Sequence, residues 1–343
     1  MKARQWILIA ACVCLVGGLY VHAKGREHIY GKDTCAIVMK SRNNWYNELA
    51  VQGYQEIMEE NGKNVISVYP DNISAQEQIR IIRSLIQDNV SAIALAANDE
   101  YALTPVLREA MERGISVITL DGDTEPGSRS IYVKPVDDKL LGKELAKEVY
   151  LHCGHRGQWA VLSAASRSAN QNEWIYAIKE ELQEPVYREL RLVDIAYGNG
   201  EYEKAAGETR RLLETYPDLK LICSLSTTGS LAAADVIKEE KKEGEVKVIG
   251  LGLPGEMAGV TGTGEEDVCP VLYVWDPREM GRLAAHISLG LSEGKLKAQE
   301  GETMEFGDHV HSVKTGSDGG LEVISGMPIK VDSENIGYWK TIF

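Results

Sequence analysis

The sequence TCAIVM at residues 34–39 is a continuous apolar run with the length of a buried strand. The segment that follows it carries Leu49, Gly53 and Ile57 at helical spacing. A buried strand followed by an amphipathic helix is a βα unit, the element from which α/β proteins build parallel sheets. This stretch therefore predicts the α/β fold class.

The same alternation repeats along the chain. A second strand is predicted at residues 64–69, and Ser74 with Glu77 then forms a capping box that marks the start of a helix. Further strands are predicted at residues 92–96, 116–120, 131–133, 159–163, 192–196, 221–225, 246–250 and 270–274, with helices between them, for example at 101–113, 136–150 and 276–289. Strands that alternate with helices predict parallel sheets with helices on both faces.

The length of the chain indicates two lobes, because it has 343 residues and a domain usually holds about 100 to 200. The strand pattern restarts near residue 131. We predict a first lobe from residues 34–133 plus 276–300 and a second from 134–275 plus 301–343. Each lobe is expected to be a Rossmann-like parallel sheet flanked by helices, and the hinge between them to be crossed several times by the chain.

The charge balance argues against a nucleic-acid partner. The chain has 37 Lys and Arg against 51 Asp and Glu, a formal net charge of −14, whereas binding to a phosphate backbone depends on cationic contacts. We therefore predict that the protein does not bind nucleic acid.

Motifs for catalysis or cofactor binding are weak. Residues 250–255 spell G-x-G-x-x-G after a strand, but the Gly-rich residues 257–264 are unfavourable for the helix that dinucleotide binding requires. His309 and His311 have the spacing of a strand, which fits either a metal pair or a solvated hairpin face. We favour the solvated face, and we predict no cofactor, no metal site and no catalytic residues.

The N-terminal residues have the layout of an export signal, because Lys2 and Arg4 precede an apolar run at residues 6–21. Three fates fit it: lipidation at Cys12, which ends a lipobox-like Ile-Ala-Ala-Cys; cleavage after Ala23; or an uncleaved anchor, since the run is just short of the roughly 17 to 25 residues of a spanning helix. We expect residues 1–23 to form the signal or anchor. The protein is then expected in the periplasm or at the outer face of the cell membrane, anchored or lipidated.

Four cysteines follow this leader: Cys35, Cys153, Cys223 and Cys269. None has the C-x-x-C spacing of metal and redox sites. Export permits disulfides, but Cys35 and Cys223 lie in apolar strands, where a free Cys behaves as a small hydrophobic residue. We favour that interpretation.

Polar and aromatic side chains gather where the predicted strands end. Open parallel sheets bind ligands beyond the carboxyl ends of their strands, so these residues are candidates for a binding site. Groups suited to hydroxyls are offered by Lys40, Asp121, Asn170, Gln171 and Asp276, and flat apolar faces by Trp45, Tyr46, Trp174 and Trp275. Together they favour a polyhydroxylated ligand. Each has a structural alternative, such as a turn cap for Asp121, a satisfied loop amide for Asn170 or Gln171, and a core position for Trp174.

Several blocks of the sequence together resemble one family. These blocks are Lys40 and residues 90–95, 107–111, 118–124, 170–174, 274–276 and 334–337. From about residue 34 to residue 343 the chain is similar to the type I periplasmic sugar-binding proteins, and among them to the branch of the autoinducer-2 and rhamnose receptors. The resemblance implies that Lys40, Asp121, Asn170 and Gln171 hold the ligand, helped by the loop at residues 225–227.

The chain departs from the autoinducer-2 receptors at three of these positions. Their Asp-Gln pair reads Asn170-Gln171 here, and a Pro and an Ala of their ligand loop match Leu225 and Thr227. Hydrogen bonds to a charged group contribute ~1.5–3 kcal/mol, against ~0.5–1.5 kcal/mol for neutral pairs, so the amide disfavours autoinducer-2. We expect a related sugar or sugar-like diol, with Leu225 and Thr227 among the residues that bind it.

These features predict an exported, monomeric binding protein that closes on a small polyhydroxylated ligand and presents it to a membrane partner. The partner is expected to be the permease of an ABC transporter, with a membrane sensor kinase as the alternative. A transcriptional regulator of this fold needs a basic helix-turn-helix before the first lobe, where the apolar leader stands. An extracellular carbohydrate-acting enzyme would need a carboxylate pair, such as Asp121 and Asp276.

Overall fold

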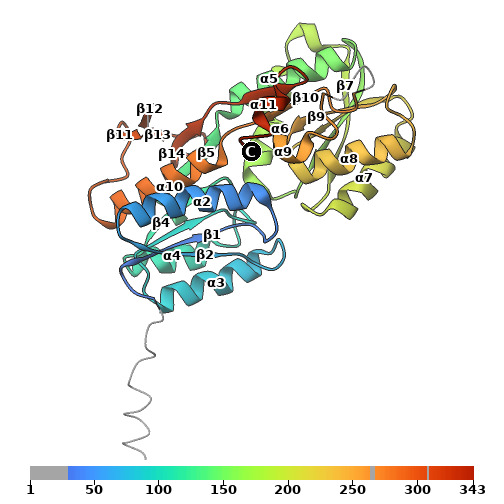
Figure 1. The fold of residues 1–343 in the computed structure, drawn as a ribbon. Helices are drawn as coiled ribbons and strands as arrows, with labels where there is room; N and C mark the ends of the chain where they lie inside the picture. The colour runs from blue at the N-terminus through green and yellow to red at the C-terminus, as the bar shows by residue number, and fades with distance from the viewer. Residues whose placement is uncertain (1–29, 263–266, 307–308) are drawn as a thin grey trace, which may run out of the picture.

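The computed structural model describes residues 30–262, 267–306 and 309–343. Within them the chain forms two lobes, the first in the lower part of Figure 1 and the second in the upper part. The leader expected at residues 1–23, with Lys2, Arg4 and Cys12, lies outside the described residues. No helix in the described part combines the length and the apolar character needed to cross a membrane.

The first lobe is built on a sheet with the strand order β13-β14-β5-β4-β3-β1-β2. Its strands are β1 (Thr34–Val38), β2 (Asn64–Val68), β3 (Ala92–Leu95), β4 (Ser116–Leu120), β5 (Ile131–Val136), β13 (Lys314–Thr315) and β14 (Leu321–Gly326). All neighbours pair in parallel except β13, which is antiparallel to β14.

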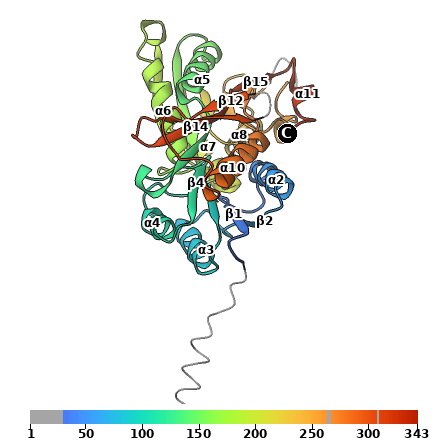
Figure 2. The same cartoon turned by 90° about the vertical axis from the view of Figure 1, so that its left-hand side faces the viewer.

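Helices cover both faces of this sheet because successive strand residues point to opposite sides. Ile37 and Met39 pack toward α2 (Trp45–Glu60) and α10 (Pro277–Ser292). Ala36 and Val38, which alternate with them in the sequence, pack toward α3 (Ala75–Gln87) and α4 (Thr104–Glu112). Figure 2 shows the strands between these two pairs of helices. Burial on both sides explains why the run at residues 34–39 is apolar throughout.

The second lobe has a sheet with the order β15-β10-β9-β8-β6-β7. Its strands are β6 (Gly157–Ser163), β7 (Leu190–Tyr197), β8 (Leu219–Ser224), β9 (Lys247–Leu251), β10 (Val271–Val274) and the antiparallel edge strand β15 (Ile329–Asp332). One face is covered by α5 (Asp138–His152) and α6 (Ala169–Glu181), and the other by α7 (Tyr202–Thr215) and α8 (Thr227–Glu239). The expected α/β architecture with two parallel-sheet lobes is therefore confirmed.

The remaining elements are short. They are α9 (Pro254–Met257), α11 (Ile336–Trp339), the 3₁₀ helices η1 (Pro126–Ser128) and η2 (Pro185–Tyr187), and the hairpin of β11 (Thr303–Phe306) and β12 (His309–Ser312). The G-x-G-x-x-G sequence leads only into the single turn of α9, not into a full helix. A Cβ at Gly255 would overlap the Phe343 carbonyl, to which the Gly255 N–H donates a 2.8 Å hydrogen bond. This glycine therefore serves close packing.

The described chain passes between the two sheets three times: from β5 to α5, from β10 to α10, and from β14 to β15. Lys134 ties two of these segments together, because its Nζ lies 2.6 Å from Asp138 and 2.8 Å from Glu322. We expected all of residues 301–343 in the second lobe, which is wrong for β13 and β14. Residues 321–326 pair in parallel with β5 and extend the first sheet. The turn-rich sequence of this tail contains no local pattern that predicts such a pairing.

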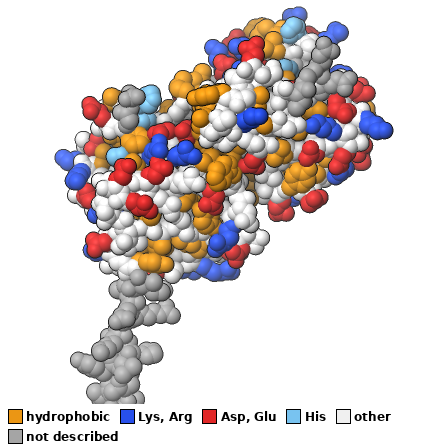
Figure 3. Space-filling model, in the orientation of Figure 1, with side chains coloured by type: hydrophobic (Ala, Val, Ile, Leu, Met, Phe, Trp, Pro, Cys, Tyr) orange, Lys and Arg blue, Asp and Glu red, His pale blue; other side chains and the backbone are white. Residues whose placement is uncertain are grey.

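On the face drawn in Figure 3, acidic and basic side chains are interspersed over both lobes. This face therefore carries no continuous basic surface of the kind that a phosphate backbone requires.

Candidate functional site

A cavity of about 150 Å³ lies where the carboxyl ends of the two sheets face each other. One buried water needs only ~10–15 Å³ measured in this way, so the cavity has room for a small organic molecule. The ends of β1, β3 and β4 contribute Lys40, Asn98 and Asp121, and the ends of β6 to β10 contribute the opposite wall. This is the place that the topology of open parallel sheets predicts for a ligand.

Nine of the eleven residues proposed from the sequence line this cavity. They are Lys40, Tyr46, Asp121, Asn170, Gln171, Trp174, Leu225, Thr227 and Trp275. Trp45 and Asp276 do not line it.

The backbone turns at Asp121 so that its side chain enters the cavity. The residue follows β4 with φ of 57°, a left-handed conformation that Asp and Asn adopt more readily than most residues. The Tyr132 hydroxyl donates a 2.9 Å hydrogen bond to its carbonyl, and the carboxylate is only 8% exposed.

Gly122 has a different role. A Cβ at this position would lie 2.6 Å from Lys40 Cε and would overlap the Ala97 carbonyl oxygen. Because Gly122 has no side chain, the Lys40 side chain can pass close to its backbone and reach Asp121.

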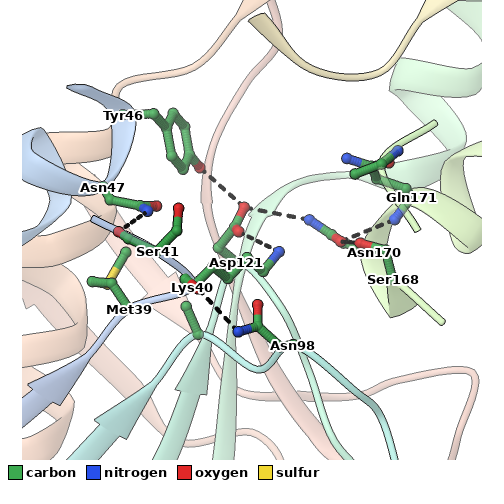
Figure 4. A network of polar contacts seen from close by, with 12 residues as sticks. Met39, Lys40, Ser41, Tyr46, Asn47, Asn98, Asp121, Ser168, Asn170 and Gln171 are labelled. Atoms are coloured by element: carbon green, nitrogen blue, oxygen red, sulfur yellow. Dashed lines mark hydrogen bonds and ion pairs between the residues drawn. The ribbon is translucent and has the colours of Figure 1, made fainter. Parts of the chain in front are cut away.

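The Asp121 carboxylate is the centre of a polar network, drawn in Figure 4. Lys40 Nζ lies 2.7 Å from Oδ2, and Oδ1 accepts hydrogen bonds from the Tyr46 hydroxyl at 3.2 Å and from Asn170 Nδ2 at 3.3 Å. An ionised carboxylate offers about four acceptor positions. With these partners in place, about one acceptor position remains for a ligand.

An aromatic wall closes the hinge side of the cavity. Trp275 Nε1 donates a 2.7 Å hydrogen bond to the Tyr46 hydroxyl, and the Trp174 and Trp275 rings lie 5.3 Å apart. Because its oxygen accepts from Trp275, Tyr46 donates its own proton to Asp121. Burial, reinforced by the Asp121 charge, raises the pKa of Tyr46 well above its usual value, so the phenol remains a donor.

Gln171 is mainly a positioning residue. Its Oε1 accepts from Ser163 Oγ and from the Ala164 N–H, both at 2.7 Å, and its Nε2 donates to the Leu225 carbonyl at 3.0 Å. One N–H remains for a ligand. The side chain therefore holds two cavity loops together.

The loop at residues 225–227 is held by the start of α8. Ser226 Oγ caps the helix at the Gly229 N–H, and Thr227 Oγ1 accepts from the Leu253 N–H at 3.0 Å. The Thr227 hydroxyl keeps its proton for donation, and Leu225 supplies an apolar surface that is 1% exposed.

Trp45 and Asp276 are corrections to the predicted site. Trp45 is 46% exposed; neighbours in a helix point about 100° apart, so Trp45 turns away when Tyr46 faces the cavity. Asp276 caps α10, because its Oδ1 accepts from the N–H groups of Arg278 and Glu279. The carboxylate pair that an enzyme would need from Asp121 and Asp276 is therefore not formed at the cavity.

Sequence reasoning missed Asn98, which lines the cavity two residues after the predicted third strand. The strand-end rule that found Asp121 would also have found it. Its Oδ1 is one of two buried side-chain atoms at this cavity without a hydrogen-bond partner, the other being Trp174 Nε1.

The lobes also touch at the mouth of the cavity. Arg167, in the second lobe, pairs with Asp99 of the first at 3.2 Å. Gly200 of the second lobe and Ile73 of the first both line the cavity, and a Cβ at Gly200 would lie 2.5 Å from Ile73 Cδ1. The structure therefore has the lobes closed.

His309 and His311 lie on β12 with ring centroids 6.3 Å apart. No group of three or more His, Cys, Asp or Glu side chains in the described ranges has the geometry to hold a metal ion.

The comparison with known families identifies the fold. Residues 35–296 match the periplasmic binding protein domain family. The chain belongs to this family. A solved ABC transporter solute binding protein from Clostridium phytofermentas, with bound L-rhamnose, superposes with a TM-score of 0.88 and 36% sequence identity, covering 90% of this chain and 98% of that one.

Two further proteins are similar to this chain. The D-ribose/D-allose-binding protein of Pseudomonas aeruginosa is 26% identical over 256 residues, 71% of this chain and 77% of the relative. LsrB from Clostridium saccharobutylicum in complex with AI-2 has a TM-score of 0.80 at 20% identity, covering 89% of this chain and 98% of that one, a likeness that shows the fold alone. The predicted resemblance is confirmed, and the relatives are binding proteins rather than enzymes.

Proposed function

We propose that this protein binds one monosaccharide between its lobes. The observation that carries the proposal is the Lys40–Asp121–Asn170 network beside the indole rings of Trp174 and Trp275 in one cavity. The hydroxyls of a sugar can hydrogen-bond to this polar network, and its apolar C–H faces can pack against the indole rings. Burial makes such charge-assisted hydrogen bonds effective.

The favoured ligand class is a deoxyhexose such as L-rhamnose, the sugar bound by the 36% identical relative. The residues of the second lobe at this cavity include the apolar side chains of Leu225, Leu251, Leu253 and Val274, which suit a methyl group better than a hydroxymethyl group. The amide of Asn170 replaces the carboxylate of the autoinducer-2 receptors, so AI-2 is expected to bind more weakly.

Calorimetry with a panel of sugars tests this function. The panel holds L-rhamnose, L-mannose, D-fucose, D-ribose and D-allose, together with AI-2. Binding of L-rhamnose at least about tenfold tighter than L-mannose, which differs in carrying a hydroxymethyl group, is expected. Heat signals at the level of buffer for every sugar would end the proposal.

The proposed membrane partner is inferred from similar proteins that are ABC transporter solute binding proteins. We assign the protein an extracytoplasmic location and a transporter permease as its partner. Uptake of labelled sugar by cells should then disappear on deletion of the chain and return with the wild type, but not with Asp121→Asn. Uptake that persists in the deletion strain would favour the sensor-kinase alternative.

A further inference from the structure

Asn98 combines a fixed orientation with an unused hydrogen-bond acceptor. Its backbone N–H donates to Gln78 Oε1 at 2.9 Å, and its Nδ2 donates to the Lys40 carbonyl at 2.9 Å. Gln78 is fully buried and donates from Nε2 to the carbonyls of Met39 and Ala96. Asn98 is thus held between the ends of β1 and β3.

This arrangement fixes the orientation of the Asn98 amide at the cavity wall. The Lys40 carbonyl is an acceptor, so it must meet the NH₂ end of Asn98, and the amide oxygen takes the other side. Figure 4 shows that oxygen pointing toward the ends of the Lys40 and Asp121 side chains, with no contact drawn to it. The atom is buried and has no hydrogen-bond partner.

A buried acceptor without a partner is costly, and a sugar needs acceptors here. Asp121 already receives Lys40, Tyr46 and Asn170, which leaves it about one further acceptor position. Two neighbouring hydroxyls therefore cannot both donate to Asp121 while these contacts persist. Asn98 Oδ1 is a second acceptor of the same lobe at the same cavity.

Resting on the proposed function, we infer that Asn98 Oδ1 accepts a hydrogen bond from a second sugar hydroxyl, next to the one that donates to Asp121. Because the oxygen is enclosed while the lobes are closed, the sugar reaches it when the lobes open and then close around it. Asn98 is thereby a specificity-determining residue, which selects sugars that carry both hydroxyls.

The test measures discrimination instead of affinity alone. L-Rhamnose and analogues that each lack one hydroxyl are titrated against wild type and Asn98→Ala. One analogue lacks the hydroxyl that donates to Asp121, and another lacks the hydroxyl that donates to Asn98. We expect the second analogue to bind wild type about tenfold more weakly than the parent sugar, because it leaves Asn98 Oδ1 unpaired. Asn98→Ala should bind that analogue and the parent within about twofold of each other, and keep its discrimination at the other positions.

Asn172→Ala is the matched control. Its Nδ2 also donates to a backbone carbonyl, that of Ser166 at 3.0 Å, but the residue does not line the cavity, so its discrimination should equal that of wild type. If Asn98→Ala weakens all sugars in parallel, Asn98 only supports the fold and the inference is wrong. If wild type binds no sugar, the proposed function and this inference fail together.

A crystal structure with L-rhamnose tests the same contact without a variant. A sugar hydroxyl within hydrogen-bond distance of Asn98 Oδ1 supports the inference. A sugar bound in the cavity with Oδ1 out of reach of every hydroxyl overturns it, whatever the stability of Asn98→Ala.

Discussion

Asn170 Nδ2, at the start of α6 in the second lobe, donates a 3.3 Å hydrogen bond to the Asp121 carboxylate at the end of β4 in the first. A further hydrogen bond between the lobes runs from Trp275 Nε1 to the Tyr46 hydroxyl at 2.7 Å, and Arg167 and Asp99 add an ion pair whose Arg side chain is 67% exposed. Exposed ion pairs contribute only ~0.2–1 kcal/mol. A ligand that contacts both lobes therefore adds substantially to what holds them together.

The first prediction concerns closure in solution. Saturating L-rhamnose should lower the radius of gyration measured by small-angle X-ray scattering, because the sugar favours the closed state. Arg167→Ala without sugar should shift the profile toward larger dimensions, and added sugar should restore it. A profile that does not respond to saturating sugar would contradict the hinge model.

The second prediction concerns Asp121. Asp121→Asn keeps the left-handed backbone conformation, which Asn tolerates, but removes the charge that pairs with Lys40. Affinity for the sugar should fall by at least about tenfold, equivalent to ~1.4 kcal/mol, as measured by calorimetry.

The Asp121→Ala variant is a poorer test. At φ of 57° an Ala is strained by about 1–2 kcal/mol, and Lys40 loses its partner, so the melting temperature should fall as well. An Asp121→Asn protein that binds sugar like wild type would show that the charge of Asp121 does not contribute to sugar binding.

Much of the fold could be read from the sequence because local periodicity and burial agree. The apolar run at residues 92–96 becomes β3, and Ser74 Oγ caps α3 at the Glu77 N–H as the capping box predicts. The Glu77 side chain instead accepts from the N–H groups of Asp71 and Asn72. Strand ends then located Lys40 and Asp121, because parallel strands bring their carboxyl ends to one edge.

The parts that escaped prediction depend on tertiary contacts. The pairing of β14 with β5 joins residues nearly two hundred positions apart, which no local pattern reports. Asp276 and Asp121 both follow a strand, yet Pro277 starts a helix that Asp276 caps, whereas Asp121 turns into the cavity. Gln171 lies on a cavity wall, but most of its side-chain hydrogen bonds go to Ser163, Ala164 and Leu225 in neighbouring segments.

The third prediction concerns Gly122. Gly122→Ala places a methyl carbon 2.6 Å from Lys40 Cε and within overlap of the Ala97 carbonyl oxygen, so both the local backbone and the Lys40 side chain at Asp121 must shift. Overpacking of this kind costs about 1–3 kcal/mol, and both urea stability and sugar affinity should fall. Gly207→Ala is the matched control, because this exposed glycine in α7 has open space at its Cβ; it should stabilise the protein by about 0.5–1 kcal/mol and leave affinity unchanged. Wild-type affinity in Gly122→Ala would argue against the assigned placement of Lys40.

The last prediction concerns acid stability and Glu148, a carboxylate of α5 that is 1% exposed. Burial alone would raise its pKa, but hydrogen bonds from His152, Lys330 and Tyr273 outweigh burial and lower the pKa to about 2. Lys330 Nζ lies 2.7 Å from Oε1, which ties the edge strand β15 to α5.

The direction in which Glu148 changes stability with pH follows from the linkage between protonation and folding. A carboxyl whose folded pKa is depressed stabilises the native state above its unfolded pKa of about 4.3, and this contribution is lost as the pH falls toward 2. Burial raises the pKa of Asp123 and Asp138 instead, so these two groups change stability with pH in the opposite direction. The difference between wild type and Glu148→Gln isolates the Glu148 contribution, which is up to about 3 kcal/mol at neutral pH.

Urea unfolding between pH 7 and pH 2 measures this difference. Glu148→Gln should be less stable than wild type at pH 7, and the two proteins should converge as the pH falls from about 4 toward 2. Glu144→Gln is the matched control, because Glu144 also accepts from Tyr273 but is 29% exposed and lies 3.9 Å from its cation, Lys147; its unfolding curve should stay near that of wild type at pH 7. A constant gap between wild type and Glu148→Gln at every pH would show that the variant loses packing, and that the carboxylate's hydrogen bonds do not set the acid limit of the second lobe.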